Sequence, residues 1–412
     1  MRSKDVLAIN FSKNVFRSIP FNVWKILQYF DGSHSLADLS LAWSKGEEYF
    51  NQKVFKLISR YYNIFFYGKP KAFLKNDLPI IEDDAYGISN HHPNIRIPIL
   101  PFEINFNITY SCNLRCIYCF QNSKLRQKHK ELPINLALGL LDNMIKSEIP
   151  MISITGGEPL CYPHILEFLK EIKIKGIILH KFLTNAAAIS EDVLNTLVWV
   201  QPKEIWVSLE SCNPKKLDKI YQVNGMGKKI LRNIKRLKAS GLKVGINCTV
   251  TKYYINEITP LLDWCESNKI TNFCLSSCRI WGERSGLIPS IEQEHDILSL
   301  IDEFKYNRAN SIKNIYFLHS KNLDCSAMKY TLTVDPYGNF IPCDWFCGTN
   351  SLVMGNIFKN SIKKLWGSRD HLSLYSIFHL NENNCTRNEC KKMLFMKNEF
   401  PELNEHILNS KE

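Results

Sequence analysis

The chain has 412 residues, too many for one ordinary domain, and its 45% apolar and 22% charged residues exclude an intrinsically disordered protein. Its net charge of +12 could suit nucleic-acid binding, but much of the excess lies on stretches such as residues 228–243. There apolar residues recur at helical spacing, so the basic residues line the opposite face. We therefore interpret the charge as solvated helix faces and expect no nucleic-acid partner.

The sequence carries no signal for export or membrane insertion. No apolar run approaches the ~18 residues that a membrane-spanning helix needs, and the first ten residues do not form a secretory signal. The 14 cysteines are then expected in a reducing compartment, where clustered cysteines are more often metal ligands or catalytic groups than disulfides. We expect a cytoplasmic protein without membrane association.

Residues 1–68 predict a small module. Two strand candidates, "VLAINF" (6–11) and "VFRSIP" (15–20), precede three short amphipathic helices within residues 21–68. Two strands and three helices are typical of a winged-helix-like domain. Residues 69–101 contain five prolines and broken periodicity, which predicts a linker.

Residues 102–310 predict an α/β core. Strand candidates alternate with amphipathic segments of helical length, which indicates a parallel sheet wrapped by helices, a partial (βα)6 barrel. The six strand candidates lie at residues 102–109, 151–155, 176–184, 204–210, 243–250 and 272–277. Residues 311–412 follow as a cysteine-rich extension.

Polar residues follow several of these strands directly. The first strand leads into three cysteines, the second into "TGGEP", the third into "TN" and the fourth into "SLE". Because the carboxyl ends of parallel strands meet at one mouth of a barrel, these residues are expected to form an active site there.

The three cysteines, Cys112, Cys116 and Cys119, have the spacing C-x3-C-x2-C. Structural zinc sites and ordinary iron–sulfur clusters are usually held by four protein ligands. Three thiolates on a [4Fe–4S] cluster leave one iron open, which is typical of a catalytic centre rather than a structural one. A zinc site remains the simpler alternative for a C-x2-C pair taken by itself.

This motif, with aromatic Tyr118 before the last cysteine, resembles that of the radical S-adenosylmethionine (SAM) superfamily. The resemblance implies a [4Fe–4S] cluster on the three cysteines and SAM bound through its methionine group to the open iron. It also implies cleavage of SAM to a 5′-deoxyadenosyl radical that abstracts hydrogen from carbon. An electron donor such as a flavodoxin or ferredoxin is implied as a partner.

Three further segments resemble the SAM-binding strand ends of that superfamily, although Glu210 stands where aspartate is usual. Close backbone approach at the two glycines and a fixed turn at Glu158 and Pro159 suit this role. The residues implied in SAM binding are Gly156, Gly157, Glu158, Pro159, Asn185, Ser208 and Glu210.

The second cysteine cluster begins at Cys325, with Gly338 and Cys343 spaced C-x12-G-x4-C. This pattern resembles the SPASM and twitch extensions of radical SAM enzymes, which hold auxiliary clusters, although five cysteines stand where the full SPASM pattern has seven. We expect one auxiliary [4Fe–4S] cluster, with Cys347 as a spare or alternative ligand. Its expected ligands are Cys325, Cys343, Cys385 and Cys390. A zinc knuckle is the alternative.

Asp344 directly follows Cys343 in "PCD". In the related sulfatase maturases an aspartate at this place acts as a base, which makes Asp344 a candidate catalytic base. Aspartate is also common in turns, so a turn or surface role is an equal alternative.

The segment "WKILQYFDGSHSLADLS" resembles the peptide-recognition domain of enzymes that modify ribosomally made peptides, whose best-known member is the carrier in pyrroloquinoline quinone biosynthesis. Such a domain offers an edge strand to which a leader peptide adds. A winged helix that binds DNA or only braces the barrel is the alternative. Residues 1–90 hold 12 Lys and Arg against 9 Asp and Glu, too small an excess to favour DNA binding.

We therefore expect a radical SAM enzyme that forms a thioether or carbon–carbon cross-link in a leader-guided precursor peptide. A sulfatase-maturase-like enzyme that generates formylglycine is the first alternative. A zinc-bound, nucleic-acid-binding protein is a remote one.

Overall fold

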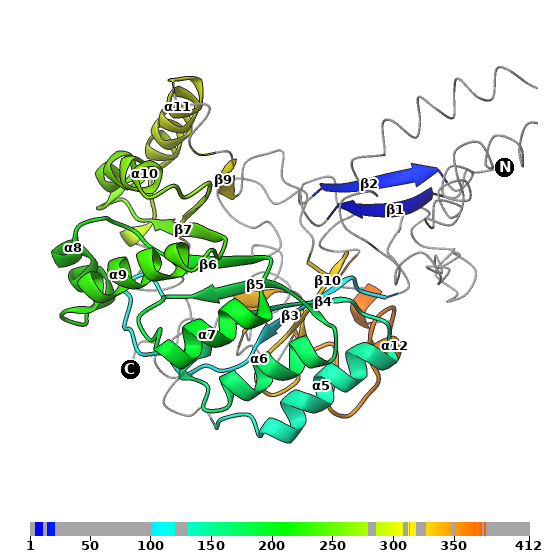
Figure 1. Ribbon diagram of the computed structural model, residues 1–412. Coiled ribbons are helices and arrows are strands. Elements are labelled where there is room, and N and C mark those ends of the chain that lie inside the picture. The colour runs from blue at the N-terminus through cyan, green and yellow to red at the C-terminus, as the bar shows by residue number, and fades with distance from the viewer. Residues whose placement is uncertain are drawn as a thin grey trace, which may run out of the picture. The chain divides into compact units, whose positions relative to one another are not determined.

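The computed structural model divides into two compact units, Met1–Ile99 and Leu100–Glu412, which are described separately (Figure 1). The structure describes residues 5–10, 15–20, 100–119, 130–278, 286–307, 312, 314–318, 327–347, 352–368, 370–372 and 375. The domain division at residues 68, 101 and 310 stays a prediction.

The first unit contains an antiparallel hairpin of β1 (Asp5–Asn10) and β2 (Val15–Pro20), in which Asp5 pairs with Pro20 and Asn10 with Val15. Both strands predicted for this module are therefore confirmed. The predicted helices between residues 21 and 68 and the predicted linker lie outside the described residues.

The second unit is built on a nine-stranded sheet in the order β11-β10-β3-β4-β5-β6-β7-β8-β9. All six predicted core strands are present and pair in parallel with their neighbours in chain order. Their bounds are β3 Glu103–Asn107, β4 Met151–Thr155, β5 Ile178–Thr184, β6 Glu204–Ser208, β7 Val244–Val250 and β8 Asn272–Ser277.

The sheet extends beyond six strands at both edges. β9 (Asn314–Leu318) pairs in parallel with β8, and β10 (Thr331–Val334) pairs in parallel with β3. The short β11 (Phe340–Ile341) closes a hairpin with β10. The cysteine-rich region thus adds strands directly beside the strand that leads into the three cysteines. β9 and β11 form the two ends of the sheet, as expected of a partial barrel.

Amphipathic helices cover the sheet, and Figure 1 shows α5, α6 and α7 side by side. In α6, Ile165, Phe168, Leu169 and Ile172 are buried at helical spacing. Phe168 packs on Phe106 of β3, with ring centroids 5.8 Å apart. The helices are α5 Ile134–Lys146, α6 Ile165–Ile174, α7 Glu191–Val200, α8 Pro214–Tyr221, α9 Met226–Ala239, α10 Ile258–Ser267, α11 Ile291–Asn307 and α12 Ile362–Leu365.

The basic stretch at residues 228–243 forms most of α9, whose buried residues include Ile230, Ile234 and Leu237. Its lysines at 228, 229 and 235 are exposed, which confirms the solvated helix face predicted there. In the described part of the chain, no helix is both long and apolar enough to cross a membrane.

Residues of β3 alternate between the two faces of the sheet. Phe106 faces α6, whereas Glu103, Asn105 and Asn107 share the other face. On that face, Glu103 bonds Ser153 of β4 and the Nδ1 of His180 of β5. The face away from the helices is therefore polar, and it leads to the carboxyl ends of the strands.

Candidate active site

The three cysteines lie in the loop that follows β3, which we call the cysteine loop (residues 108–119). Cys112, Cys116 and Cys119 are all partly buried. The Cys119 N–H donates to the Cys116 carbonyl at 3.1 Å, which closes a tight turn between the second and third cysteines. The Leu114 N–H donates to the Cys112 sulfur at 3.4 Å. Hydrogen bonds from the loop's own backbone thus help to position the three cysteines.

The electrostatics of the cysteine loop fit an iron–sulfur cluster. Burial raises the pKa of the Cys116 thiol well above its usual value, and the charges of Glu210, Cys119 and Cys112 raise it further. Thiolates so placed repel one another unless a cationic centre compensates them, as iron does. Among the described residues, no three His, Cys, Asp or Glu side chains are close enough to share a single ion. A cluster does not require this, because each thiolate binds a different iron atom.

Gly156 and Gly157, which follow β4, lie against the backbone of the cysteine loop. A Cβ atom at Gly157 would be 2.4 Å from the carbonyl oxygen of Ser111, and one at Gly156 would be 2.4 Å from that of Thr109. The Gly157 N–H also donates to the Thr109 carbonyl at 2.7 Å. The close approach predicted for these glycines was to a ligand, whereas the close contact that the structure describes is with the chain's own backbone. Their binding of SAM stays a prediction.

Glu158 joins the end of β4 to the end of β5. Its buried carboxylate accepts hydrogen bonds from the Thr184 hydroxyl at 2.7 Å, the Asn185 N–H at 2.6 Å and the Leu160 N–H at 3.1 Å. Burial raises its pKa to about 7, against the effect of these donors. Pro159 is buried and begins the 3-10 turn Pro159–Cys161. The "GGEP" segment therefore organises two strand ends.

Asn185 brings the end of β5 to the cysteine loop. Its side-chain nitrogen donates to the Asn113 side-chain oxygen at 2.7 Å and lies 3.9 Å from the Cys112 sulfur. Its oxygen accepts from the Ala187 N–H at 2.9 Å. The structure thus brings together the first three strand ends that the sequence pointed to.

Glu210, just beyond β6, also faces the cysteine loop. Burial raises its pKa to about 7, while the hydroxyls of Tyr118 and Tyr221 and the Thr249 N–H lower it. The Thr249 N–H lies 3.4 Å from Oε1. Ser208, the last residue of β6, is partly buried, and its carbonyl accepts from the Tyr221 hydroxyl at 3.1 Å. The Glu210 carboxylate therefore lies beside the tyrosine that precedes the third cysteine.

Three buried oxygen atoms near the ends of β6 and β7 have no hydrogen-bond partner within the described part of the chain. They are Glu210 Oε2, Asn247 Oδ1 and Thr251 Oγ1. Unpaired buried acceptors are costly, so they suit a ligand that carries hydroxyl or amino donors, as SAM does. Sequence reasoning missed Asn247 as a site residue. The alternation of small and polar residues along β7 is the sequence pattern that could have indicated it.

Asp344 lies in the 3-10 turn Asp344–Phe346, and the residue is partly buried. The side-chain nitrogen of Asn105 donates to Oδ2 at 2.7 Å, and that of Asn107 donates to Oδ1 at 2.6 Å. Burial raises the pKa of Asp344, the two asparagines lower it, and the charge of Glu103 raises it further. The cysteine-rich region thus inserts a carboxylate onto the polar face of β3. Sequence reasoning did not single out either asparagine.

Two cysteines of the predicted auxiliary set are described. Cys343 is partly buried, and Cys347 is buried in a cluster with Tyr110 and Ile341. The other three, Cys325, Cys385 and Cys390, lie outside the described residues. The ligand set of the auxiliary cluster therefore stays a prediction.

Comparison with known proteins identifies the two parts of this site. The model of the radical SAM superfamily matches residues 106–265, and that of an iron–sulfur cluster-binding domain, SPASM, matches residues 325–392. Fe-coproporphyrin III synthase of Methanosarcina barkeri is 26% identical over 204 residues, 48% of this chain and 50% of its own length. The subtilosin biosynthesis protein AlbA of Bacillus subtilis is 24% identical over 279 residues, 65% of this chain and 60% of its own.

Among solved structures, Streptococcus suis SuiB bound to S-adenosylmethionine has the same fold. The TM-score is 0.68 at 17% identity, over 93% of this chain and 92% of SuiB. The chain spans about half to three fifths of the length of the two curated relatives named above.

The matched domains define the cofactors. A radical SAM domain binds S-adenosylmethionine and a [4Fe–4S] cluster, and a SPASM domain binds auxiliary iron–sulfur clusters. The matches cover the cysteine loop, the "GGEP" segment and the region around Asp344. The chain contains a radical SAM domain, matched over residues 106–265, and a SPASM domain, matched over residues 325–392.

Proposed function

We propose that this protein modifies a ribosomally synthesised precursor peptide, forming a thioether or carbon–carbon cross-link. The relative whose match extends further along the chain, AlbA, is named for the biosynthesis of subtilosin, a bacteriocin. SuiB, which shares the fold, has been crystallised with a precursor peptide, SuiA. The match to Fe-coproporphyrin III synthase is shorter, at 204 residues against 279, so it gives less support for a tetrapyrrole substrate.

Cys112, Cys116 and Cys119 would hold the [4Fe–4S] cluster, leaving one iron for SAM. Bound there, SAM would supply the 5′-deoxyadenosyl radical needed to abstract hydrogen from an unactivated carbon. Gly156 and Gly157 would place the "GGEP" backbone beside the methionine group. These glycines contact the cysteine loop directly, so the loop and the SAM site would keep a fixed geometry.

Other residues would bind the rest of SAM. Asn185 follows the third core strand and Ser208 is the last residue of the fourth. The unpaired Oε2 of Glu210 could accept a hydrogen bond from a SAM hydroxyl or amino group. Because Glu158 is held by three donors, we assign it the positioning of Asn185 rather than direct contact with SAM.

The observation that carries the proposal of a peptide-oxidising site is the placement of Asp344. Asn105 and Asn107 orient both carboxylate oxygens on the polar face of β3, and that strand leads into the cysteine loop. A carboxylate whose pKa is raised by burial is a better base than an exposed one. The hydrogen atom of the first joined atom would go to the 5′-deoxyadenosyl radical. We propose that Asp344 accepts the proton that the second joined atom loses when the new bond forms, while the electron lost with it would pass to the auxiliary iron–sulfur cluster.

The first unit would bind the leader peptide. The β1–β2 hairpin is a two-stranded sheet to which an extended peptide can add a strand. Strand addition would raise the local concentration of the core peptide at the active site. The unit contains no cysteine, so its contribution would be affinity rather than chemistry.

We further infer one auxiliary [4Fe–4S] cluster on Cys325, Cys343, Cys385 and Cys390, with Cys347 as the spare thiol. Two clusters require about eight irons per chain, whereas about twelve would contradict this assignment. A flavodoxin or ferredoxin would supply electrons. The 14 cysteines suit a reducing compartment, for which we propose the cytoplasm.

Deleting residues 1–68 tests the proposal. The truncated enzyme should still release 5′-deoxyadenosine in dithionite, but it should modify the full precursor peptide much more slowly. Supplying the module in trans should partly restore turnover. Modification at the full-length rate would rule out leader binding by this unit.

Mass spectrometry of the co-expressed peptide separates the candidate reactions. A cross-link removes two hydrogen atoms, one from each joined atom, whereas formylglycine formation replaces a Cys or Ser side chain by an aldehyde. An aldehyde without a cross-link would favour the sulfatase-maturase-like alternative.

A further inference from the structure

The C-terminal end of the short helix α8 binds the backbone of the cysteine loop. The Arg115 N–H donates to the Tyr221 carbonyl at 2.9 Å, and the Ile117 N–H donates to the Ile220 carbonyl at 3.0 Å. Arg115 lies between the first and second cysteines, and Ile117 lies between the second and third. The orientation of α8 therefore determines where these two segments of the cysteine loop lie.

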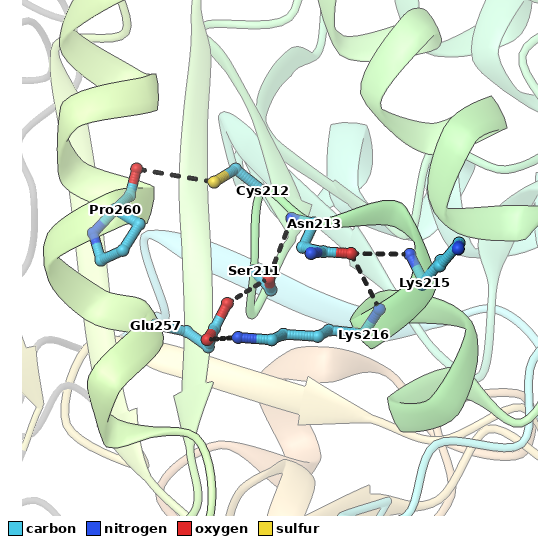
Figure 2. Close-up of polar contacts among 7 residues, drawn as sticks. All are labelled: Ser211, Cys212, Asn213, Lys215, Lys216, Glu257 and Pro260. Carbon is cyan, nitrogen blue, oxygen red and sulfur yellow. Dashed lines mark hydrogen bonds and ion pairs between the residues drawn. The ribbon is translucent and has the colours of Figure 1, made fainter.

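The N-terminal end of α8 is fixed by a set of polar contacts, shown in Figure 2. The side-chain oxygen of Asn213 caps the helix by accepting from the Lys215 N–H at 3.0 Å and the Lys216 N–H at 3.3 Å. The Asn213 N–H in turn donates to the Ser211 hydroxyl oxygen at 2.9 Å. These contacts join the helix start to the turn after β6.

Glu257 connects this turn to the segment after β7. Its Oε2 accepts from the Ser211 hydroxyl at 2.6 Å, and its Oε1 pairs with the Lys216 ammonium (Figure 2). Ser211 is fully buried and Glu257 is 7% exposed. Burial would raise the pKa of Glu257, but Lys216 and Ser211 hold it below its usual value. The Glu257 carboxylate thus binds both Ser211, which precedes α8, and Lys216, which lies in the first turn of α8.

The helix itself can transmit this restraint. Eight residues span only ~12 Å, and Leu217, Ile220 and Tyr221 are all fully buried. The Asp218 carboxylate accepts from the Gly225 and Gly227 N–H groups at 2.8 and 2.7 Å, which fixes the exit from the helix. A packed helix this short moves as one body, so a shift at its start reaches its last carbonyls.

We propose that Glu257 is a positioning residue for the radical SAM cluster, because it anchors α8 through Ser211 and Lys216 and α8 anchors the cysteine loop. The inference rests on the assignment of the cluster to Cys112, Cys116 and Cys119. Glu257 touches neither the cysteines nor the strand ends that would bind SAM. Its effect passes through the two amides that the cysteine loop donates to α8.

The experiment compares Glu257→Gln, Lys216→Met and Lys216→Arg in the full chain. Asp142→Asn, which removes the exposed Lys175–Asp142 ion pair at 2.8 Å, is the matched control. Amide exchange of Arg115 and Ile117 is measured in the cluster-free protein. The electron paramagnetic resonance signal of the reduced, reconstituted protein is then recorded with and without SAM.

We expect exchange at both amides to accelerate about ten-fold in Glu257→Gln and Lys216→Met, because each change removes a charged hydrogen bond at the helix start. Lys216→Arg should restore the wild-type rate by restoring the ion pair. Asp142→Asn should leave it unchanged. The change that SAM produces in the resonance signal should be weakened only in the first two variants.

Unchanged exchange at Arg115 and Ile117 in Glu257→Gln would overturn the proposal. Equal acceleration at a core amide such as Ile246 of β7 would also overturn it, because Glu257 would then stabilise the whole domain without positioning the loop. Wild-type protein that holds no iron after reconstitution would instead contradict the cluster assignment. The exchange result would remain valid, because it is measured in the cluster-free protein.

Discussion

Replacing Gly157 by alanine should disturb the cysteine loop directly. The new Cβ would lie 2.4 Å from the Ser111 carbonyl oxygen and 2.5 Å from that of Tyr110, and both are main-chain atoms that no side-chain rotation can move away. Ordinary contact would require the two segments to separate by ~1 Å. That movement would stretch the hydrogen bond from Gly157 N–H to the Thr109 carbonyl, now 2.7 Å.

The cost follows from these two effects. Overpacking of this kind costs about 1–3 kcal/mol, and one weakened backbone hydrogen bond adds ~1 kcal/mol. Gly157→Ala should therefore lower the free energy of unfolding by about 2–4 kcal/mol, and Tm by roughly 3–6 °C. Because the shift occurs beside Cys112, the variant should also retain less iron and bind SAM more weakly.

Gly139→Ala in α5 is the matched control. A Cβ there meets nothing within 4 Å, and the residue has no positive φ. Alanine in a helix interior should stabilise the protein by about 0.5–1 kcal/mol. The measurements are thermal unfolding, iron content and SAM binding on anaerobically purified protein. If Gly157→Ala matched the wild type in stability and iron content, the packing argument would be refuted.

Three further predictions concern the cluster, the base and a buried histidine. Cys116→Ala should abolish release of 5′-deoxyadenosine in dithionite, and persistent release would remove Cys116 from the cluster. Asn107→Ala should slow peptide modification at saturating substrate, because Asp344 loses one of its two asparagine donors. The affinity for SAM should stay unchanged. If the modification rate and the SAM affinity fell equally, Asn107 would belong to the SAM site instead. Burial lowers the pKa of His371 to about 4, so its neutral form stabilises the fold above pH 6.5 and that stability is lost as the pH falls from 6.5 towards 4. The loss should reach ~3 kcal/mol in acid unfolding curves, whereas His371→Gln should flatten that dependence and His164→Gln, at an exposed position, should not.

The sequence determined those parts of the site that lie within one short segment. The three cysteines fall within eight residues, and their spacing resembles the radical SAM motif, which implies one cluster with an open iron. The strands were readable because β-branched and apolar runs alternate with amphipathic helices, and that alternation allows few topologies. The rule that parallel strands present their carboxyl ends at one edge then brought Asn185 and Glu210 towards the same site.

Only the tertiary structure decided how distant segments contact one another. Asp344 meets Asn105 across 239 residues, and Ser211 meets Glu257 across 46. No local pattern encodes such pairs, because they arise from which strands become neighbours and which faces turn inward. The role of the "GGEP" glycines also emerged in this way. Two backbones approach too closely for any side chain between them, and the sequence shows two glycines without showing what lies opposite.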